Sequence, residues 1–234
     1  MENKWLDSVI VAYKKYYGNV APIVMDIGTR DGDDAQFFRE RLEVSEVYAF
    51  DANPKAVAKT KEQYPDFKVF ELAVSNYNGK TSFMAVDSGD RNVDGCSSIY
   101  AEKIVSNEGG NFEDKYQEIE VDVTRMDTFI ETNNLNNSLI SIVKVDIEGF
   151  TYECIEGFGD YVKNVLIFHL ETEREATHPE HKNNIQVATL MRTLGFVLVD
   201  LSYEWGWGIQ DQVWINKEIV VNQILFNNFV EPPL

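Results

Sequence analysis

The stretch MDIGTRDGDD, residues 25–34, follows a short apolar run and precedes a segment with helical spacing of apolar residues. Two glycines, Gly28 and Gly32, stand at this predicted strand-to-helix turn, where glycine lets the backbone pass close to a ligand. The turn also carries four carboxylates, namely Asp26, Asp31, Asp33 and Asp34. Because these charges disfavour a bound phosphate, the stretch predicts an α/β ligand site for a molecule that tolerates nearby carboxylates.

Apolar, β-rich runs recur on both sides of this turn, with helical segments between them. Several runs are almost continuously apolar, as expected for parallel strands buried on both faces of a sheet. The expected strands cover residues 22–28, 46–52, 67–74, 139–148, 164–171, 196–203 and 211–216. The link EWGWGIQ before the last strand is too short for a helical crossover, so the last two strands should pair antiparallel. We therefore predict a doubly wound, mostly parallel seven-stranded sheet that ends in an antiparallel hairpin.

Helix signals fit between these strands. One helix is expected over residues 33–43, and another begins at Asn53 and Pro54, a suitable N-cap followed by proline at the first helical position. A third, over residues 184–194, stops at Gly195, a natural C-cap.

The chain divides on this pattern into three parts. Residues 1–20 form an N-terminal helical segment, residues 21–218 form the main domain and residues 219–234 form a C-terminal tail. The strand–helix rhythm fails over residues 75–126, where two strand-like runs predict a β-rich insertion. Its Gly/Ser/Asn-rich centre, about residues 87–115, is expected to be a loop or lid on the ligand face.

Composition narrows the functional classes. The 234 residues carry 39 acidic and 21 basic side chains, a formal charge of −18 that disfavours nucleic acid and anionic membrane surfaces as partners. Cys96 and Cys154 have no metal-ligand spacing, and the N-terminus has no secretory signal pattern. We therefore expect a cytoplasmic protein with a small-molecule partner.

The acidic residues and the spacing of the motifs narrow the choice of cofactor. Asp51 ends the second expected strand, 25 residues after Asp26, where a carboxylate can accept both ribose hydroxyls of a nucleoside. A third glycine of the dinucleotide fingerprint and the Gly-Lys-Ser/Thr of the P-loop are missing. S-adenosylmethionine fits better, because it joins adenosine to a sulfonium and an ammonium and has no phosphate. An NAD-dependent oxidoreductase and a non-catalytic cofactor-binding module are the alternatives.

The motifs together resemble the FkbM-type S-adenosylmethionine-dependent methyltransferases of the class I, Rossmann-like group. The matching pieces are DIGTRDG (26–32), VYAFDANP (47–54), ELAVSNYNGKTSF (71–83), DVTRMDTFI (122–130), VKVDIEGFTYECIEG (143–157) and QDQVWIN (210–216). The resemblance implies methyl transfer to oxygen, typically to a hydroxyl of a saccharide or another natural-product-like small molecule.

The resemblance also implies which residues bind the cofactor. Its methionine end would be held by Asp26, Gly28 and Gly32. Its ribose would be held by Asp51 and Ala52, and its adenine would be flanked by Ala73 and Val74. Either Ser97 or Ser98 would close over it.

The ends of the fourth and fifth expected strands supply the candidate catalytic groups. Asp146 and Glu148 stand two residues apart, as do His169 and Glu171, so each pair shares a face if the strands stay extended. We expect Asp146 or His169 to remove the hydroxyl proton and Glu171 to position the acceptor. Asp146 contacting the cofactor's ammonium, Glu148 capping the next helix and His169 being a core residue are the alternatives.

Other candidate groups are less specific. We assign no metal site, although Asp146 and Glu171 could hold a divalent metal such as Mg²⁺. A zinc site at His178 and His181 is disfavoured, because two close histidines in a polar loop more often face solvent. The aromatic side chains Tyr203, Trp205 and Trp207 could pack on a sugar ring or simply cover the core, and Asp211 could accept hydrogen bonds from acceptor hydroxyls.

Overall fold

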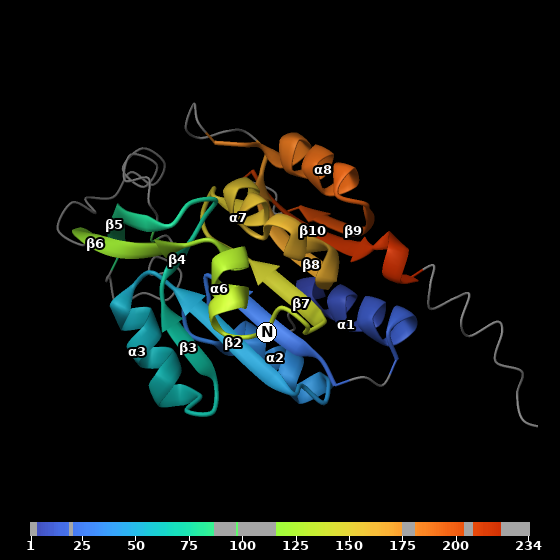
Figure 1. Cartoon of the computed structure of the whole chain (residues 1–234), viewed down its shortest axis with the longest axis horizontal. Helices are drawn as coiled ribbons and strands as arrows, with labels where there is room; N and C mark the ends of the chain where they lie inside the picture. The colour runs from blue at the N-terminus through green and yellow to red at the C-terminus, as the bar shows by residue number, and fades with distance from the viewer. Residues whose placement is uncertain are drawn as a thin grey trace, which may run out of the picture.

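A seven-stranded sheet forms the centre of the protein (Figure 1). The computed structural model describes residues 4–18, 21–86, 97, 116–174, 181–203 and 208–220. In spatial order the strands are β3 (Lys68–Glu71), β2 (Glu46–Asp51), β1 (Ile23–Ile27), β7 (Ile140–Val145), β8 (Val165–Glu173), β10 (Ile209–Asn216) and β9 (Phe196–Tyr203). The first five are mutually parallel, and β10 runs antiparallel to both of its neighbours. The predicted fold class is therefore confirmed.

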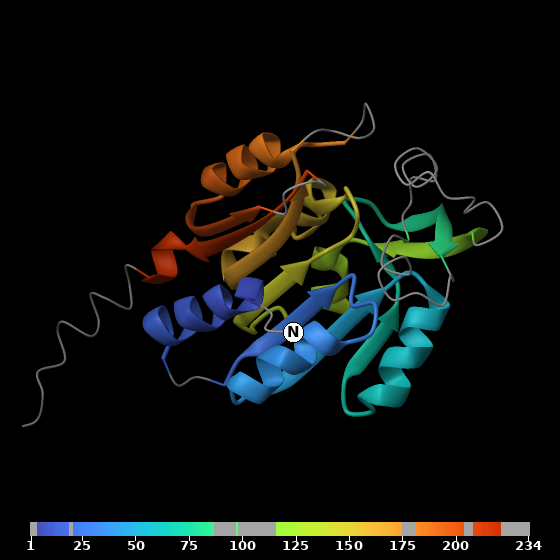
Figure 2. The ribbon, with the colours of Figure 1, turned by 180° about the vertical axis from the view of Figure 1, so that it is seen from behind.

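Helices cover both faces of this sheet. The helices are α1 (Lys4–Tyr16), α2 (Asp33–Arg41), α3 (Pro54–Gln63), α6 (Met126–Thr132), α7 (Thr151–Gly157), α8 (Asn184–Thr193) and the 3₁₀ helix η2 (Gly159–Asn164). One apolar core joins α1 and α2 to the sheet (Figure 2), and another joins α6, α7 and α8 to the opposite face. The N-terminal helix thus packs into the first of these cores, with Val9 and Tyr13 buried, and Tyr17 directly after the helix is buried there too.

The run 67–74 was expected to be one strand, and the structure divides it between two sheets. After β3, the Leu72 amide donates to the Asp51 carbonyl at 3.0 Å, and the chain then leaves the main sheet. A second sheet has the order β4 (Ala73–Val74), β6 (Tyr116–Thr124), β5 (Gly79–Val86). Both strands expected within 75–126 are present, and they pair antiparallel. Of residues 87–115, the structure describes Ser97.

The expected helix ends are confirmed by their caps. The side chain of Asn53 accepts from the Lys55 amide at the start of α3, and Pro54 is the first helical residue. Asn183 and Gln186 form a capping box at the start of α8, which is followed by Gly195 with φ +89°. These caps satisfy backbone groups that a helix end leaves without an intrahelical partner.

The fourth expected strand, 139–148, ends earlier than its apolar pattern suggested. β7 stops at Val145, and Glu148 and Gly149 have φ of +49° and +99°, which is turn geometry rather than strand geometry. The expectation that Asp146 and Glu148 share a face through an extended strand was therefore wrong. Their side chains still approach one another, because the chain turns back on itself there.

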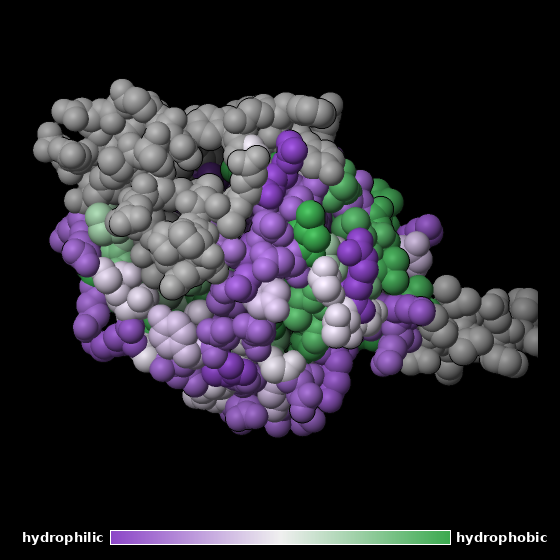
Figure 3. Space-filling model, turned by 90° about the horizontal axis from the view of Figure 1, so that it is seen from above, coloured by the Kyte–Doolittle hydropathy of each residue, from purple (hydrophilic) through white to green (hydrophobic). Residues whose placement is uncertain are grey.

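The described surface is mostly hydrophilic on the face shown in Figure 3, with a smaller apolar area. Among the described residues, exposed large apolar side chains include Ile185 on α8 and Val197, Val199 and Leu201 on the edge strand β9. None of the described helices is long and apolar enough to cross a lipid bilayer.

Candidate cofactor and active site

One face of the sheet changes from apolar to charged towards the carboxyl ends of the parallel strands. Aligned residues on neighbouring strands there read Val24–Ile142–Ile167, then Asp26–Lys144–His169, then Glu171–Asp211, with Asp146 directly after β7. The apolar row belongs to the core under α1 and α2. Because successive rows lie two residues apart on each strand, the charged side chains point to the same face and line one edge. This edge is where open α/β sheets bind ligands.

Gly28 opens the turn between β1 and α2 with φ +82°. Its amide and that of Thr29 both donate to the Phe50 carbonyl at 2.9 Å. A Cβ at position 28 would stand 1.8 Å from the carbonyl oxygen of Asp146, so no side chain fits. The requirement for glycine therefore arises from the protein backbone itself, whereas the sequence alone suggested close approach of a cofactor.

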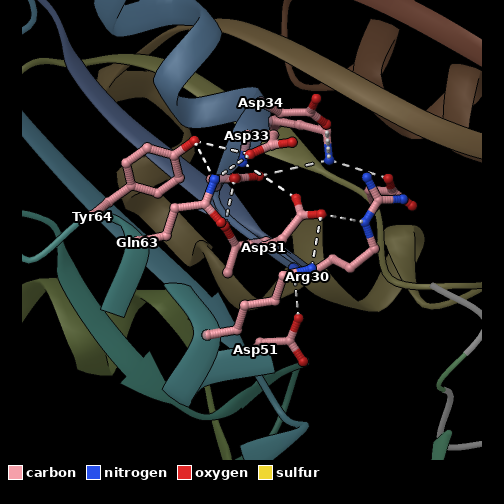
Figure 4. Close-up of polar contacts among 12 residues, drawn as sticks. Arg30, Asp31, Asp33, Asp34, Asp51, Gln63 and Tyr64 are labelled. Atoms are coloured by element: carbon pink, nitrogen blue, oxygen red, sulfur yellow. Dashed lines mark hydrogen bonds and ion pairs between the residues drawn. The ribbon is translucent and has the colours of Figure 1, made fainter. Parts of the chain in front are cut away.

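Gly32 closes the same turn with φ +80° and directly precedes α2. A Cβ there would stand 2.7 Å from the Tyr64 ring. The neighbouring Asp33 carboxylate accepts from the Tyr64 hydroxyl at 2.9 Å and from Gln63 at 3.1 Å, as Figure 4 shows. These contacts fix the turn to the end of α3, so Gly32 too is explained by packing within the chain.

Asp51 lies at the end of β2, beside the Gly28 turn (Figure 4). One carboxylate oxygen accepts from the Arg30 amide and the other from the Asn53 amide, both at 2.8 Å. Burial raises the pKa of Asp51 to about 6, although these two amides oppose the shift. Each oxygen keeps a second lone pair, so the carboxylate is oriented and can still accept two ribose hydroxyls.

Three further predicted cofactor residues, Ala52, Ala73 and Val74, are buried and apolar. Ala52 and Ala73 are buried together with Phe83, Val121 and Val123, which form a small apolar core. Val74 is buried in the larger core of the α6 face. The Ser97 hydroxyl oxygen accepts from the Val86 amide at 3.0 Å and from the Asn53 side-chain amide at 3.4 Å. Ser98 lies outside the described residues.

Lys144 belongs to the charged edge, although the motif pattern does not mark it as a site residue. Its side chain is 5% exposed, and its Nζ lies 3.0 Å from Asp34, 3.1 Å from Asp146 and 3.6 Å from Asp26. Burial opposes the charge on Lys144, but the three carboxylates outweigh it and hold the pKa of Lys144 well above its usual range. The sequence did carry a signal, namely a lysine inside an apolar strand two residues before Asp146.

Asp26 lies beneath the turn and has no exposed surface. Its carboxylate accepts from the Thr29 hydroxyl at 2.7 Å and faces Lys144. Burial raises the pKa of Asp26, and Lys144 opposes that shift. Asp26 therefore connects the start of the glycine turn to the charged row.

Three carboxylates meet at the ends of β7 and β8. Ligand oxygens of Asp146, Glu148 and Glu171 all lie within 4.8 Å of one another. Burial, followed by the charges of Asp146, Glu148 and Asp211, raises the pKa of Glu171 well above its usual range. The site thus combines Glu171, which keeps its proton to a higher pH than an ordinary glutamate, with Asp146, whose side chain is 33% exposed.

His169 lies one row deeper than Glu171 and is 3% exposed. Neither ring nitrogen has a hydrogen-bond partner among the described residues, and Nε2 lies 3.4 Å from Asp211. Burial, with a smaller contribution from Lys144, lowers the pKa of His169 to about 4. The imidazole is therefore neutral near pH 7, and it is a weaker base than an ordinary histidine.

Of the other candidate histidines and aromatic residues, the structure describes the side chain of His181. His181 is buried, lies 3.6 Å from Glu173 and packs on Gly149, where a Cβ would stand 2.6 Å from its ring. His178, Trp205, Trp207 and the Tyr203 side chain lie outside the described residues. Within the described chain, His181 supports the turn that carries Glu148.

The sequence of this chain is similar to a known protein family and to one characterised methyltransferase. A family model described as the methyltransferase FkbM domain matches residues 26–198. The 2-O-methyltransferase NoeI of Sinorhizobium fredii (strain NBRC 101917 / NGR234) is 26% identical over 159 residues, which are 64% of this chain and 63% of that protein. The chain thus spans less than two thirds of the length of this relative.

Solved structures give two further similarities. M. capricolum TrmK in complex with S-adenosyl-homocysteine is 10% identical, with a TM-score of 0.47 over 92% of this chain and 69% of that one. The magnesium protoporphyrin IX methyltransferase ChlM of Synechocystis PCC 6803, with bound SAM, is 9% identical, with a TM-score of 0.49 over 90% of this chain and 77% of that one.

The family match begins at Asp26, before the glycine turn, and runs past the charged ends of β7 and β8. It covers well over half of the 234 residues. The chain therefore belongs to the FkbM family of S-adenosylmethionine-dependent methyltransferases.

Proposed function

We propose that the protein transfers the methyl group of S-adenosylmethionine to a hydroxyl oxygen of a saccharide or a saccharide-bearing small molecule. One observation carries the proposal: Asp51, the Gly28 turn, Asp146 and Glu171 follow one another along the same sheet edge, on β2, β1, β7 and β8. A donor held by its ribose at Asp51 would extend over Gly28 towards Asp146. The acceptor would then lie against Asp146 and Glu171.

The chemistry of methyl transfer suits this arrangement. Displacement at a sulfonium methyl is in line, so the protein chiefly aligns the acceptor oxygen with the methyl carbon. We assign the acceptor contact to Glu171, which as a protonated acid can donate a hydrogen bond to an acceptor oxygen. The proton of the attacking hydroxyl would pass to Asp146 or to the neutral His169.

Exposure favours Asp146 over His169 as the first proton acceptor. The Asp146 side chain is 33% exposed, whereas the His169 side chain is 4% exposed and lies behind Glu171 and Asp211. A proton could reach His169 only after these carboxyl groups had moved or relayed it. The name of NoeI, a 2-O-methyltransferase, supports oxygen as the atom methylated.

The cofactor is tested first, by isothermal titration calorimetry with S-adenosylmethionine, S-adenosylhomocysteine and NADH. We expect micromolar binding of the first two and none of NADH, the ligand of an oxidoreductase. Failure of both adenosyl ligands to bind would reject the proposal.

The acceptor is tested with a methyl-labelled donor and a panel of sugars and sugar-bearing compounds, with product identified by mass spectrometry. Label in an O-methyl group supports the proposal, and label in nucleic acid alone contradicts the expectation of a small-molecule acceptor. Cofactor binding without product across a broad panel would favour a non-catalytic module. The assay is repeated with EDTA and with added Mg²⁺, because oxygen atoms as close as those of Asp146, Glu148 and Glu171 suit a divalent cation.

A further inference from the structure

We propose that Lys144 is a positioning residue that fixes both ends of the glycine turn for cofactor binding, a role that rests on the proposed function. Asp26 stands two residues before Gly28, and Asp34 stands two residues after Gly32. The Lys144 ammonium lies 3.6 Å from the first carboxylate and 3.0 Å from the second. One buried cation thus connects the strand that enters the turn to the helix that leaves it.

The same ammonium reaches the acceptor side of the site. Lys144 Nζ donates to Asp146 Oδ2 at 3.1 Å. Its partners therefore come from β1, from the first turn of α2 and from the segment after β7. Lys144 lies near the carboxyl end of β7, where the strand is still paired with both β1 and β8, so it is a fixed point for the more exposed turn.

Burial makes this connection strong. The Lys144 side chain is 5% exposed and the Asp26 side chain is 0% exposed, so water screens their attraction poorly. Among the described residues, Lys144 is the only lysine or arginine that is buried. Removal of its charge would leave several buried or half-buried carboxylates facing one another, which costs free energy and separates the ends of the turn.

The orientation of Asp51 depends on the shape of this turn. Arg30 has φ +52°, a strained backbone for a residue with a side chain, and its amide is one of the two that orient Asp51. If the ends at Asp26 and Asp34 separate, this amide shifts and the ribose-binding carboxylate loses its orientation. Lys144 therefore acts on the cofactor through the turn, without touching it.

An alternative effect of Lys144 is simple repulsion of a cationic cofactor, and two ligands distinguish it. S-adenosylmethionine carries a sulfonium charge and S-adenosylhomocysteine does not. If Lys144 positions the turn, Lys144→Met weakens both ligands alike, by about tenfold or more. If Lys144 only repels charge, the same substitution tightens S-adenosylmethionine and changes S-adenosylhomocysteine little.

The experiment measures both ligands by calorimetry on the full chain, for wild type, Lys144→Met, Lys144→Arg and Lys68→Met. Lys68 is the matched control, because it pairs with Glu46 at 2.8 Å on the neighbouring β2 and β3 but is half-exposed and far along the sheet from the turn. We expect Lys144→Arg to recover most of the affinity and Lys68→Met to leave it unchanged.

Asp34→Asn keeps the proposal testable if Lys144→Met does not fold. Asparagine keeps an oxygen for Lys144 but removes the charge, so both ligands should weaken alike and by less than in Lys144→Met. Unchanged affinity in either variant, or tighter S-adenosylmethionine binding in Lys144→Met, overturns the positioning role. Wild-type protein that binds neither ligand would instead reject the proposed function.

Discussion

Gly28 faces the carbonyl oxygen of Asp146 so closely that a Cβ at position 28 would stand 1.8 Å from it. The contact joins the turn after β1 to the residue that follows β7, and the Asp146 amide donates to the Ile27 carbonyl at 2.9 Å beside it. The two halves of the proposed site, cofactor turn and acceptor carboxylate, are thus in direct backbone contact.

Replacement of Gly28 by alanine should therefore destabilise the fold strongly. Gly195 is the matched control, because its φ of +89° resembles the +82° of Gly28 but a Cβ there meets nothing within 4 Å. Gly195→Ala should cost about 1 kcal/mol of unfolding free energy from backbone strain alone. Gly28→Ala should cost about 3 kcal/mol or more, because overpacking is added. Urea denaturation measures both, and equal costs would contradict the close contact.

Asp51→Ala should weaken S-adenosylhomocysteine by about ten- to a hundredfold, the effect of losing hydrogen bonds to a charged group. Asp66→Ala is the control, because Asp66 is an exposed partner of Arg39 away from the sheet edge. Calorimetry on the two variants makes the comparison. If both bind like wild type, Asp51 does not hold the ribose.

Cofactor affinity should also fall in acid. The pKa of Asp51 is raised to about 6, so the carboxylate is ionised above that pH and gains a proton below it. The protonated form accepts hydrogen bonds poorly, so affinity should be constant from pH 7 to 8 and decline below about pH 6. Titration of S-adenosylhomocysteine at several pH values measures the decline. In Asp51→Asn, the part of this decline that protonation of Asp51 causes should be absent.

Substitutions at the two candidate bases should separate turnover from cofactor binding. Asp146→Asn should lower kcat by about a hundredfold or more, a typical contribution of a general base. His169→Gln should lower kcat by less than Asp146→Asn does, if the buried ring receives the proton only after Asp146 has accepted it. Initial rates at saturating donor, together with cofactor calorimetry, test both. Unchanged kcat in His169→Gln would eliminate His169 from the proton path.

The architecture was predictable because it depends on local patterns. Largely apolar runs such as residues 139–145 identify buried parallel strands, and Asn53–Pro54 and Gly195 mark helix ends by the backbone groups that they satisfy. The division of residues 67–74 between two sheets was missed, because the sequence of Ala73 and Val74 does not reveal that β6 will pair with them. The early end of β7 was missed because Glu148 adopts a positive φ that its residue type disfavours.

The sequence by itself determined the sheet, the position of the turn after β1, the carboxylates at the strand ends and the resemblance to the FkbM family, since these follow from periodicity and motif spacing. Only the tertiary structure decided how the charges are paired. It joined Lys144 to Asp26, Asp34 and Asp146, and it explained Gly28 by the Asp146 carbonyl. The physical reason is that pairing depends on strand order and register: Asp26 and Lys144 are 118 residues apart in the chain and directly opposite each other on β1 and β7.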